Sequence, residues 1–352
     1  MRTWLISGYQ ATKDLLRDNR FTRHLPEQHG QLTGPALRMS ITEMDPPRHT
    51  EIRTLIGGAF SARRVEALRP VITAYAEDLL AQARGRSQAG DLLTEYCTPL
   101  TFAAQCELLG VPGHRRAAVR DLAEARLRVA GRDPAATHLA ELGLHAEITD
   151  LLADQQCPPT GLFADLLIAH RDGGLSHEDL TGLAASLFFD GHALSAAQIG
   201  HAALCLLRRP ELWERLRADP AMLSGVVEEN FRHSPAANHT MSRVATTGLE
   251  LGDIRVVAGD RVVAALPLAN RDPTAIDDPD AFLTTRDHPR HLSFGHGTHH
   301  CLGAHLARVE VQVALEVLLR GAPGLRLADP CVEPTQVVTP MMRALTALPV
   351  HW

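Results

Sequence analysis

The hydrophobic pattern of the chain is mainly helical. Apolar positions at helical spacing extend from Ser176 to Arg209, where Pro210 interrupts them. Ser176 has the form of an N-cap, because an acid, Asp179, follows three residues later. At 1.5 Å per residue this helix would be about 50 Å long, enough to cross a whole domain. Two shorter helices are predicted at residues 221–233 and 304–319.

Strand signals are short and few. Three segments alternate at strand period, at residues 249–251, 254–257 and 261–265, and Gly259-Asp260 forms a turn before the last of them. Residues 44–53 have the pattern of a turn that enters a helix, with prolines in its first turn. The predicted fold class is therefore mainly α with small β-sheets.

Composition indicates a soluble globular protein with a large core. The 352 residues are 45% hydrophobic and 22% charged, and no linker, repeat or low-complexity segment interrupts them, so one domain is predicted over 1–352. The net charge of −6 argues against nucleic acid as a partner. Neither a signal peptide nor an apolar span of about 18 residues stands at the N-terminus, so no membrane attachment is expected. Six scattered cysteines indicate a reducing cytoplasm.

One cysteine lies in a glycine-rich loop directly before the helix predicted at 304–319. A thiol at a helix N-terminus meets the positive end of the helix dipole and unpaired backbone N–H groups, and both favour the thiolate. Glycines permit tight turns and a close approach to a flat partner, because they have no Cβ. The loop therefore suits the presentation of a thiolate to a large planar group. Its residues are Phe294, Gly295, Gly297, Cys301 and Gly303.

The spacing Phe294-x-x-Gly297-x-x-x-Cys301-x-Gly303 resembles the heme-binding signature of the cytochrome P-450 family without a gap. The resemblance covers nearly the whole chain, and it implies the cytochrome P-450 fold, in which a long distal helix crosses the oxygen-binding face of a heme. It also implies that Cys301 is the axial thiolate of heme b, where its electron donation favours O–O cleavage. Phe294, Gly295 and Gly303 would belong to the cofactor-binding loop.

Two other interpretations of this loop are open from the residues alone. A lone cysteine is commonly a buried structural residue. Four neighbouring side chains could instead bind zinc, namely His296, His299, His300 and Cys301. Zinc sites usually draw their ligands from paired clusters with spacers between them, and no second Cys/His cluster stands out. This spacing argues against zinc, and the resemblance makes heme the preferred interpretation.

The resemblance assigns further residues to the heme. His49 and Arg53 are four apart and share one helical face, which suits an anionic group such as a heme propionate. Arg243 and His299 match the remaining propionate-binding positions. Behind the heme, the resemblance implies a group of ion pairs that stabilises the fold. Its members are Glu229, Arg232 and Arg286.

The distal helix departs from the family pattern. Its usual core is Ala/Gly-Gly-x-Asp/Glu-Thr, in which the acid and the alcohol organise water that delivers protons to bound dioxygen. This chain has Ala193 and Leu194 at those two positions, so both side chains of the relay are missing. Asp190 shares a helical face with Leu194, and Ser195 supplies a hydroxyl about 100° around the helix. Both are candidate catalytic residues, although Asp190 could instead anchor a substrate or hydrogen-bond locally.

The resemblance also implies a substrate pocket. Its predicted lining comes from the distal helix, from the segment after the helix at 221–233 and from the chain near its C-terminus. The residues are Phe189, Asp190, Leu194, Ala237, Asn238, His239 and Met341. The polar ones indicate either a substrate with hydrogen-bonding groups or solvent exposure. A loop at 25–39, with glycines and prolines, is expected to cap the pocket as a lid.

The ends of the chain complete the resemblance. Residues 343–350 resemble the last β-hairpin of the family. The chain begins at the second strand of the family's small sheet, so the usual first roughly forty residues are expected to be absent. Their absence would leave a sheet edge exposed.

The predicted function is that of a heme-thiolate oxidase or monooxygenase acting on a small organic substrate in bacterial secondary metabolism. Hydroxylation, oxidative coupling, ring closure and desaturation all stay open, and the substrate could be bound to a carrier protein. The resemblance implies a ferredoxin and its reductase as electron donors. The missing relay leaves two alternatives, a heme-binding protein without productive oxygen activation and a peroxide-driven peroxygenase.

Overall fold

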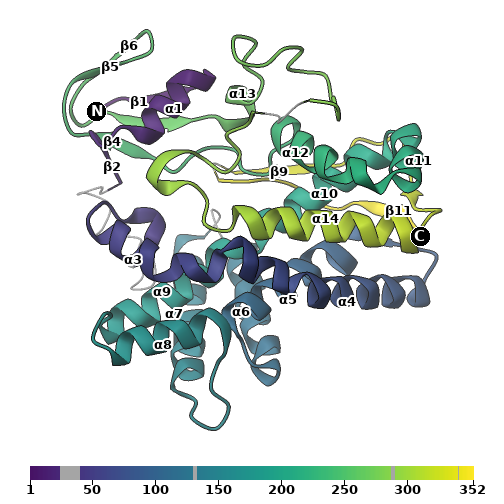
Figure 1. The fold of residues 1–352 in the computed structure, drawn as a ribbon, viewed down its shortest axis with the longest axis horizontal. Helices are drawn as coiled ribbons and strands as arrows, with labels where there is room; N and C mark the ends of the chain where they lie inside the picture. The colour runs from purple at the N-terminus through teal and green to yellow at the C-terminus, as the bar shows by residue number, and fades with distance from the viewer. Residues whose placement is uncertain (24–39, 130–132, 287–289, 340) are drawn as a thin grey trace. The chain divides into compact units, whose positions relative to one another are not determined.

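The computed structural model describes residues 1–23, 40–129, 133–286, 290–339 and 341–352, so the expected lid at 25–39 lies outside the described residues (Figure 1). The described residues form two compact units, and each is described by itself. The helical unit comprises residues 22–65 and 104–192. The sheet-bearing unit comprises residues 1–21, 66–103 and 193–352.

The helical unit is built from amphipathic helices and short helical turns. The turns are η1 (Ile41–Glu43), η2 (Gly58–Phe60) and η4 (Gly113–Arg115). The helices are α3 (Arg48–Gly57), α6 (Arg116–Val129), α7 (Pro134–Ala153), α8 (Gly161–Arg171) and α9 (His177–Gly191). α7 packs on α6 and α9, and α8 packs on α3 and α9. Apolar side chains of three of these helices, such as Leu144, Phe163 and Phe188, are fully buried, so this unit has its own core.

Helices also dominate the sheet-bearing unit. α14 (Ala304–Gly321) lies against α10 (Ala193–Leu207), α11 (Pro210–Ala218) and α12 (Leu223–His233), as Figure 1 shows. α1 (Tyr9–Arg17) packs on α13 (Leu266–Ala269) and on the turn η6 (Gly297–His299). The π-helical turn η3 (Leu93–Cys97) lies against α10. The remaining helical segments are η5 (Pro220–Met222), α4 (Ala62–Arg86) and α5 (Thr98–Leu109), and the last two run across the boundary between the units.

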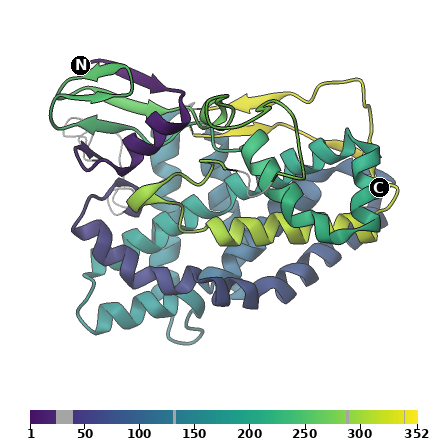
Figure 2. The same cartoon turned by 45° about the horizontal axis from the view of Figure 1, so that its top comes forward.

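The strands of the described residues form four small sheets, and Figure 2 shows several of their strands. The largest has the order β1-β7-β4-β2, with β1 (Thr3–Ile6) parallel to β7 (Arg261–Ala264) and β4 (Arg243–Ala245) antiparallel to β7; β2 is Phe21–Thr22. β5 (Leu249–Leu251) and β6 (Ile254–Val256) form a hairpin. The strands predicted at 249–251, 254–257 and 261–265 are therefore confirmed, and so is the fold class.

The prediction that residues 343–350 form a hairpin is wrong. β10 (Arg343–Leu345) pairs with β9 (Gln336–Val338), whereas β11 (Pro349–His351) pairs with β3 (Ala89–Asp91) and β8 (Arg326–Leu327). Alternation of side chains locates a strand but does not identify its partner, since each strand has two edges.

The long helix expected at 176–209 is interrupted. α9 begins as predicted, with Ser176 as N-cap and Asp179 completing a capping box. It ends at Gly191, and α10 starts at Ala193. The side chain of Gln105 donates to the Leu187 carbonyl at 2.9 Å, which is the acceptor that the Gly191 N–H would use in a continuous helix. The inserted amide therefore explains the break.

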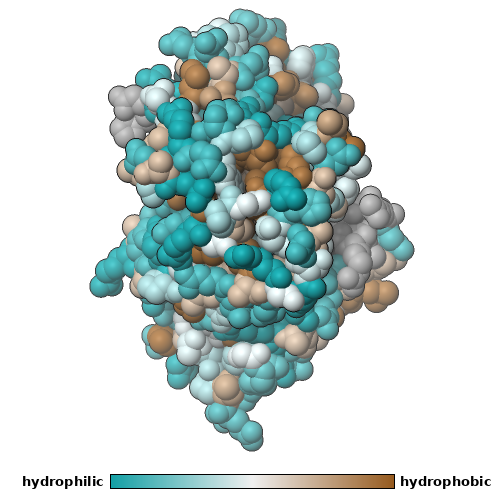
Figure 3. Space-filling model, turned by 90° about the vertical axis from the view of Figure 1, so that its right-hand side faces the viewer, coloured by the Kyte–Doolittle hydropathy of each residue, from teal (hydrophilic) through white to brown (hydrophobic). Residues whose placement is uncertain are grey.

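The face turned to the viewer in Figure 3 is mostly hydrophilic, and its hydrophobic side chains form small separate areas. Among the helices of the described residues, none combines the length and the apolar character that crossing a membrane requires.

Candidate heme-thiolate site

The cysteine loop is closed by its own backbone. The Cys301 N–H donates to the Phe294 carbonyl at 2.8 Å. Gly295 and Gly297 have φ angles of 70° and 73°, in the left-handed region that favours glycine. A Cβ on Gly297 would also lie 2.6 Å from the carbonyl oxygen of Leu16 in α1. Glycine is therefore required at Gly297 by both its conformation and its surroundings.

The end of this loop fits a planar cofactor bound through sulfur. Cys301 is exposed, and Gly303 is the N-cap residue of α14. Gly303 has an ordinary φ of −82°, and a Cβ built on it would meet nothing within 4 Å, so the space beside this residue, two positions after Cys301, is open. Within the described residues no side chain caps this helix end, so the first-turn N–H groups can stabilise a thiolate. An accessible sulfur, a helix N-terminus and open space are what heme ligation needs.

Aromatic and ionic contacts hold the loop from the side of α12. The Phe294 ring packs against Phe231, with centroids 4.7 Å apart, and the Arg308 guanidinium lies 4.4 Å from the Phe294 centroid. Arg308 also donates to both carboxylate oxygens of Glu228, at 2.6 and 3.0 Å. Burial alone would raise the pKa of Glu228, but hydrogen bonds from His291 and Arg308 outweigh it and lower the pKa to about 2. Sequence reasoning missed this role of Arg308.

The residues expected to bind the propionates are divided between the units. His49, which is buried, and Arg53, which is half-buried, lie one turn apart on α3 of the helical unit. Arg243 on β4 and His299 in η6 belong to the sheet-bearing unit. The Arg243 guanidinium is buried and donates to the Leu15 carbonyl at 3.5 Å. Each unit thus carries two of the four basic side chains.

Glu229, Arg232 and Arg286 form one buried ion-pair group. Both oxygens of Glu229 accept from Arg232 at 2.7 Å, and neither side chain is exposed to solvent. Arg286 donates to Glu229 at 3.1 Å. Arg232 further donates to the carbonyls of Asn270 and Pro279, so this group ties α12 to the chain that leads toward the cysteine loop.

The candidates on the distal helix are placed differently. Phe189 and Leu194 are half-buried, whereas the side chain of Asp190 lies outside what the structure describes. Ser195 is buried, with 6% of its surface exposed, and its hydroxyl lies against the Glu310 carboxyl of α14. Ser195 therefore faces α14.

Glu310 is a functional candidate that sequence reasoning missed. It is fully buried between α14 and α10, and burial raises its pKa to about 8, a rise that the Ser195 hydroxyl opposes only in part. Neither carboxyl oxygen has a hydrogen bond of good geometry within the described part of the chain. The signal in the sequence was an acid between Val309 and Val311 on the buried face of the predicted helix.

The expected pocket wall at 237–239 is tied to the segment at 341–342. Ala237 forms a β-bridge with Met342, and the Asn238 N–H donates to the Met341 carbonyl at 3.1 Å. The Asn238 side chain donates to the Thr339 carbonyl at 2.9 Å, so its polarity has a structural use. His239 is half-buried and bridges to Ala265, and Met341 is 45% exposed.

The zinc alternative gains no support. Among the side chains that the structure describes, no group of three or more His, Cys, Asp or Glu residues could hold a metal ion. The cysteine loop thus retains the features suited to heme.

Comparison with known proteins agrees with this geometry. The family model described as cytochrome P450 matches residues 146–321. The chain is 36% identical to nocardicin C N-oxygenase of Nocardia uniformis subsp. tsuyamanensis and 34% identical to mycinamicin IV hydroxylase/epoxidase of Micromonospora griseorubida, in each case over 99% of the chain and 89% of the relative. It superposes on the crystal structure of P450BioI in complex with a hexadec-9Z-enoic acid-ligated acyl carrier protein with a TM-score of 0.90 at 30% identity, covering 99% of this chain and 92% of that one.

The chain is matched along almost its whole length by enzymes of a single family, and its exposed cysteine lies in a loop built as that family's cofactor requires. It therefore belongs to the cytochrome P450 family and is a monooxygenase whose heme b is bound by the Cys301 thiolate.

Proposed function

We propose that this monooxygenase oxidises a small organic molecule of bacterial secondary metabolism in the cytoplasm, and that Ser195 and Glu310 take the place of the missing acid–alcohol relay. Relatives named for the N-oxygenation of nocardicin C and for the hydroxylation and epoxidation of mycinamicin IV support this substrate class. The complex of P450BioI with a ligated acyl carrier protein supports including carrier-bound substrates. A ferredoxin and its reductase are the expected electron donors.

The observation that carries the proton route is the buried Ser195–Glu310 contact. Heme b supplies dioxygen binding and one-electron chemistry when bound. A carboxyl whose pKa is about 8 stays protonated at neutral pH, so Glu310 stores a proton inside the protein. A serine hydroxyl both donates and accepts, so Ser195 can pass that proton from α14 to α10. Ser195 directly follows Leu194, the position where the usual alcohol is missing.

The test measures how electrons are divided between product and peroxide. The purified protein, a ferredoxin, its reductase and NADH are combined with nocardicin C or mycinamicin IV as first probes. Ser195→Ala and Glu310→Gln should each lower product per NADH by tenfold or more, with the lost electrons recovered as hydrogen peroxide, since a positioned proton donor contributes about 10²–10⁴-fold. Product formation should also fall as the pH rises through about 8, because Glu310 then loses its proton.

Two control variants separate this route from general damage. Ser186→Ala removes another buried hydroxyl, one that only donates to the Leu183 carbonyl, and Glu316→Gln changes an exposed acid of α14. If the controls lose product as strongly as Ser195→Ala and Glu310→Gln do, the proton route is rejected. Release of peroxide alone by the unchanged protein with every probe would favour heme binding without productive oxygen activation.

A further inference from the structure

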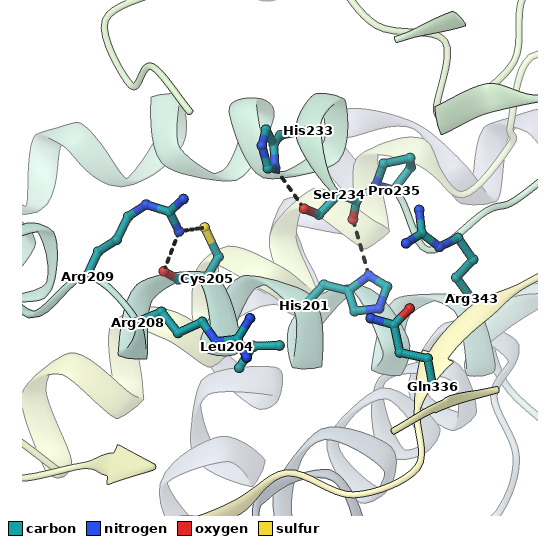
Figure 4. Close-up of a pocket in the computed structure, with 10 residues that line it drawn as sticks. All are labelled: His201, Leu204, Cys205, Arg208, Arg209, His233, Ser234, Pro235, Gln336 and Arg343. Atoms are coloured by element: carbon teal, nitrogen blue, oxygen red, sulfur yellow. Dashed lines mark hydrogen bonds between the residues drawn. The ribbon is translucent and has the colours of Figure 1, made fainter. Parts of the chain in front are cut away.

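A cavity lies in the sheet-bearing unit, and its lining includes no residue of the cysteine loop. It has a volume of about 380 Å³ and is formed by the C-terminal half of α10, the end of α12 and strands β9 and β10 (Figure 4). Its walls are partly apolar, from Leu204 and Pro235, and otherwise basic or polar. Nothing in the proposed oxidation uses this cavity.

Positive charge dominates its lining. Arg208, Arg209 and Arg343 supply three guanidinium groups. Arg208 pairs with the exposed Glu333 at 2.8 Å, and Arg209 donates to the carbonyl and the thiol of Cys205 in its own helix. No ion pair of the Arg343 guanidinium occurs among the residues that the structure describes, and Figure 4 shows that group directed toward Ser234 and Pro235. The cavity therefore offers an uncompensated guanidinium to an anion.

His201 also lines this cavity, and one of its ring nitrogens has no hydrogen-bond partner among the described residues. The residue is only 7% exposed, and its Nδ1 lies 3.2 Å from the Ser234 carbonyl oxygen. A carbonyl only accepts, so Nδ1 carries the hydrogen and Nε2 presents a lone pair. Nε2 is buried and has no hydrogen-bond partner in the described part of the chain. Burial, with Arg343 nearby, lowers the pKa of His201 to about 4, so the ring is neutral at physiological pH.

We propose that this cavity binds a phosphate group, either of orthophosphate or of a small phosphomonoester, between Arg343 and His201. A guanidinium pairs with two phosphate oxygens in a planar fork. A protonated phosphate also carries an O–H, which the Nε2 lone pair of His201 can accept. Sulfate has the same shape and no O–H at neutral pH, and carboxylates lack the O–H as well. The organic part of an ester would lie against the apolar lining residues Leu204 and Pro235.

Occupation of the site would stabilise the fold around it. The lining joins α10, α12 and β10, and a ligand that binds only the folded protein raises the unfolding temperature with its concentration. The proposal needs neither a substrate nor turnover, so it can be tested on the resting holoenzyme.

Isothermal titration calorimetry at constant ionic strength tests the proposal. The titrations are made at pH 6, because both orthophosphate and phosphomonoesters carry an O–H at that pH. One saturable site is expected for orthophosphate, and sulfate should bind about tenfold more weakly, as one lost hydrogen bond to a buried acceptor predicts. Tighter binding of glycerol 3-phosphate than of orthophosphate would identify an ester as the ligand. Failure of glycerol 3-phosphate to bind would identify free phosphate.

Variants locate the site. Arg343→Gln should weaken orthophosphate binding at least about tenfold. Arg326→Gln, a change of an exposed arginine on β8, should leave it unchanged. If Arg343→Gln does not fold, Arg208→Gln serves instead, with a smaller loss expected because Glu333 already pairs with that side chain. Equal binding of phosphate and sulfate, tighter binding of malate, or equal binding by the Arg343 and Arg326 variants would each overturn the proposal.

Discussion

The side-chain amide of Gln105 donates to the main-chain carbonyl of Leu187 at 2.9 Å, four residues before Gly191. A Cβ on Gly191 would lie 2.1 Å from that amide nitrogen. The Gln105 amide and the missing Cβ of Gly191 therefore end α9 together. The boundary between the two compact units falls directly after it, between His192 and Ala193.

Gln105 and Gly191 are therefore expected to be energetically coupled. Gln105→Ala leaves the Leu187 carbonyl without its donor and should cost about 1 kcal/mol of unfolding free energy. Gly191→Ala should cost about 1–3 kcal/mol through overpacking against the amide. The double variant should lose less than the sum of the two, because the smaller side chain at position 105 makes room. Urea unfolding measures all three values, and strict additivity would contradict the coupling.

The ion pairs of Glu228 with Arg308 and His291 should make the stability of the folded protein depend on pH in the acid range. The pKa of Glu228 is about 2 in the folded protein against an ordinary 4.5, so its ion pairs stabilise fully above about pH 4.5 and are lost as the pH falls toward 2. The difference corresponds to about 3 kcal/mol. Glu228→Gln should flatten the decline of the urea midpoint between pH 5 and pH 3. Glu51→Gln, which changes a mostly exposed acid paired with Arg48, is the control and should leave the decline unchanged.

The buried and exposed Glu-x-x-Arg pairs provide a matched comparison. Glu229→Gln leaves Arg232 charged, with none of its side chain exposed, and should cost about 3–5 kcal/mol. Glu214→Gln breaks an exposed pair with Arg217 at the same spacing and should cost less than about 1 kcal/mol. Denaturant unfolding gives both free energies. Similar values for the two variants would mean that burial does not control the strength of these pairs.

Two glycines of the cysteine loop should respond differently to alanine. Gly297→Ala places a Cβ against the Leu16 carbonyl at a positive φ, so the unfolding temperature should drop. Gly303→Ala meets open space at an ordinary φ, so the folded protein should keep its stability but bind less heme. Thermal unfolding and the Soret absorbance per protein separate these effects. Full heme content in Gly303→Ala would remove that glycine from the cofactor site.

Asp190 remains a prediction from the sequence. It lies four residues before Leu194, and its position near the missing relay makes it a candidate for anchoring a substrate or donating a proton. Asp190→Asn should weaken the spectral shift caused by the probe substrates or lower turnover. Asp172→Asn, at the exposed end of α8, is the control. Binding and turnover that both match the unchanged protein would reject a role for Asp190.

Local patterns predicted the local features. The Ser176 cap, the helix after Cys301 and the strands near 250–264 depend on neighbouring residues, and the structure has them where they were expected. The cysteine loop was predicted for the same reason, since its glycines and thiol lie within ten residues of sequence.

Features that join distant segments could not be predicted in the same way. The break after Gly191 depends on the side chain of Gln105, which lies 86 positions earlier in the chain. The hydrophobic pattern of a helix contains no information about so distant a side chain. Glu310 acquires its raised pKa from burial against α10. The role of Arg308 depends in the same way on contacts with Glu228 of α12 and with the Phe294 ring, which its own helix does not contain.

The bridge between Ala237 and Met342 bears on how enzymes of this kind diversify. Main-chain groups form that link, through the bridge itself, through the Asn238 N–H on the Met341 carbonyl and through the Arg343 N–H on the Ala236 carbonyl. The side chains of Ala237 and Met341 carry none of these bonds. Evolution or directed mutagenesis can therefore exchange both side chains while the main-chain link beneath them persists. The sequence predicts that both side chains line the substrate pocket, so such exchanges would then alter substrate preference without breaking the link.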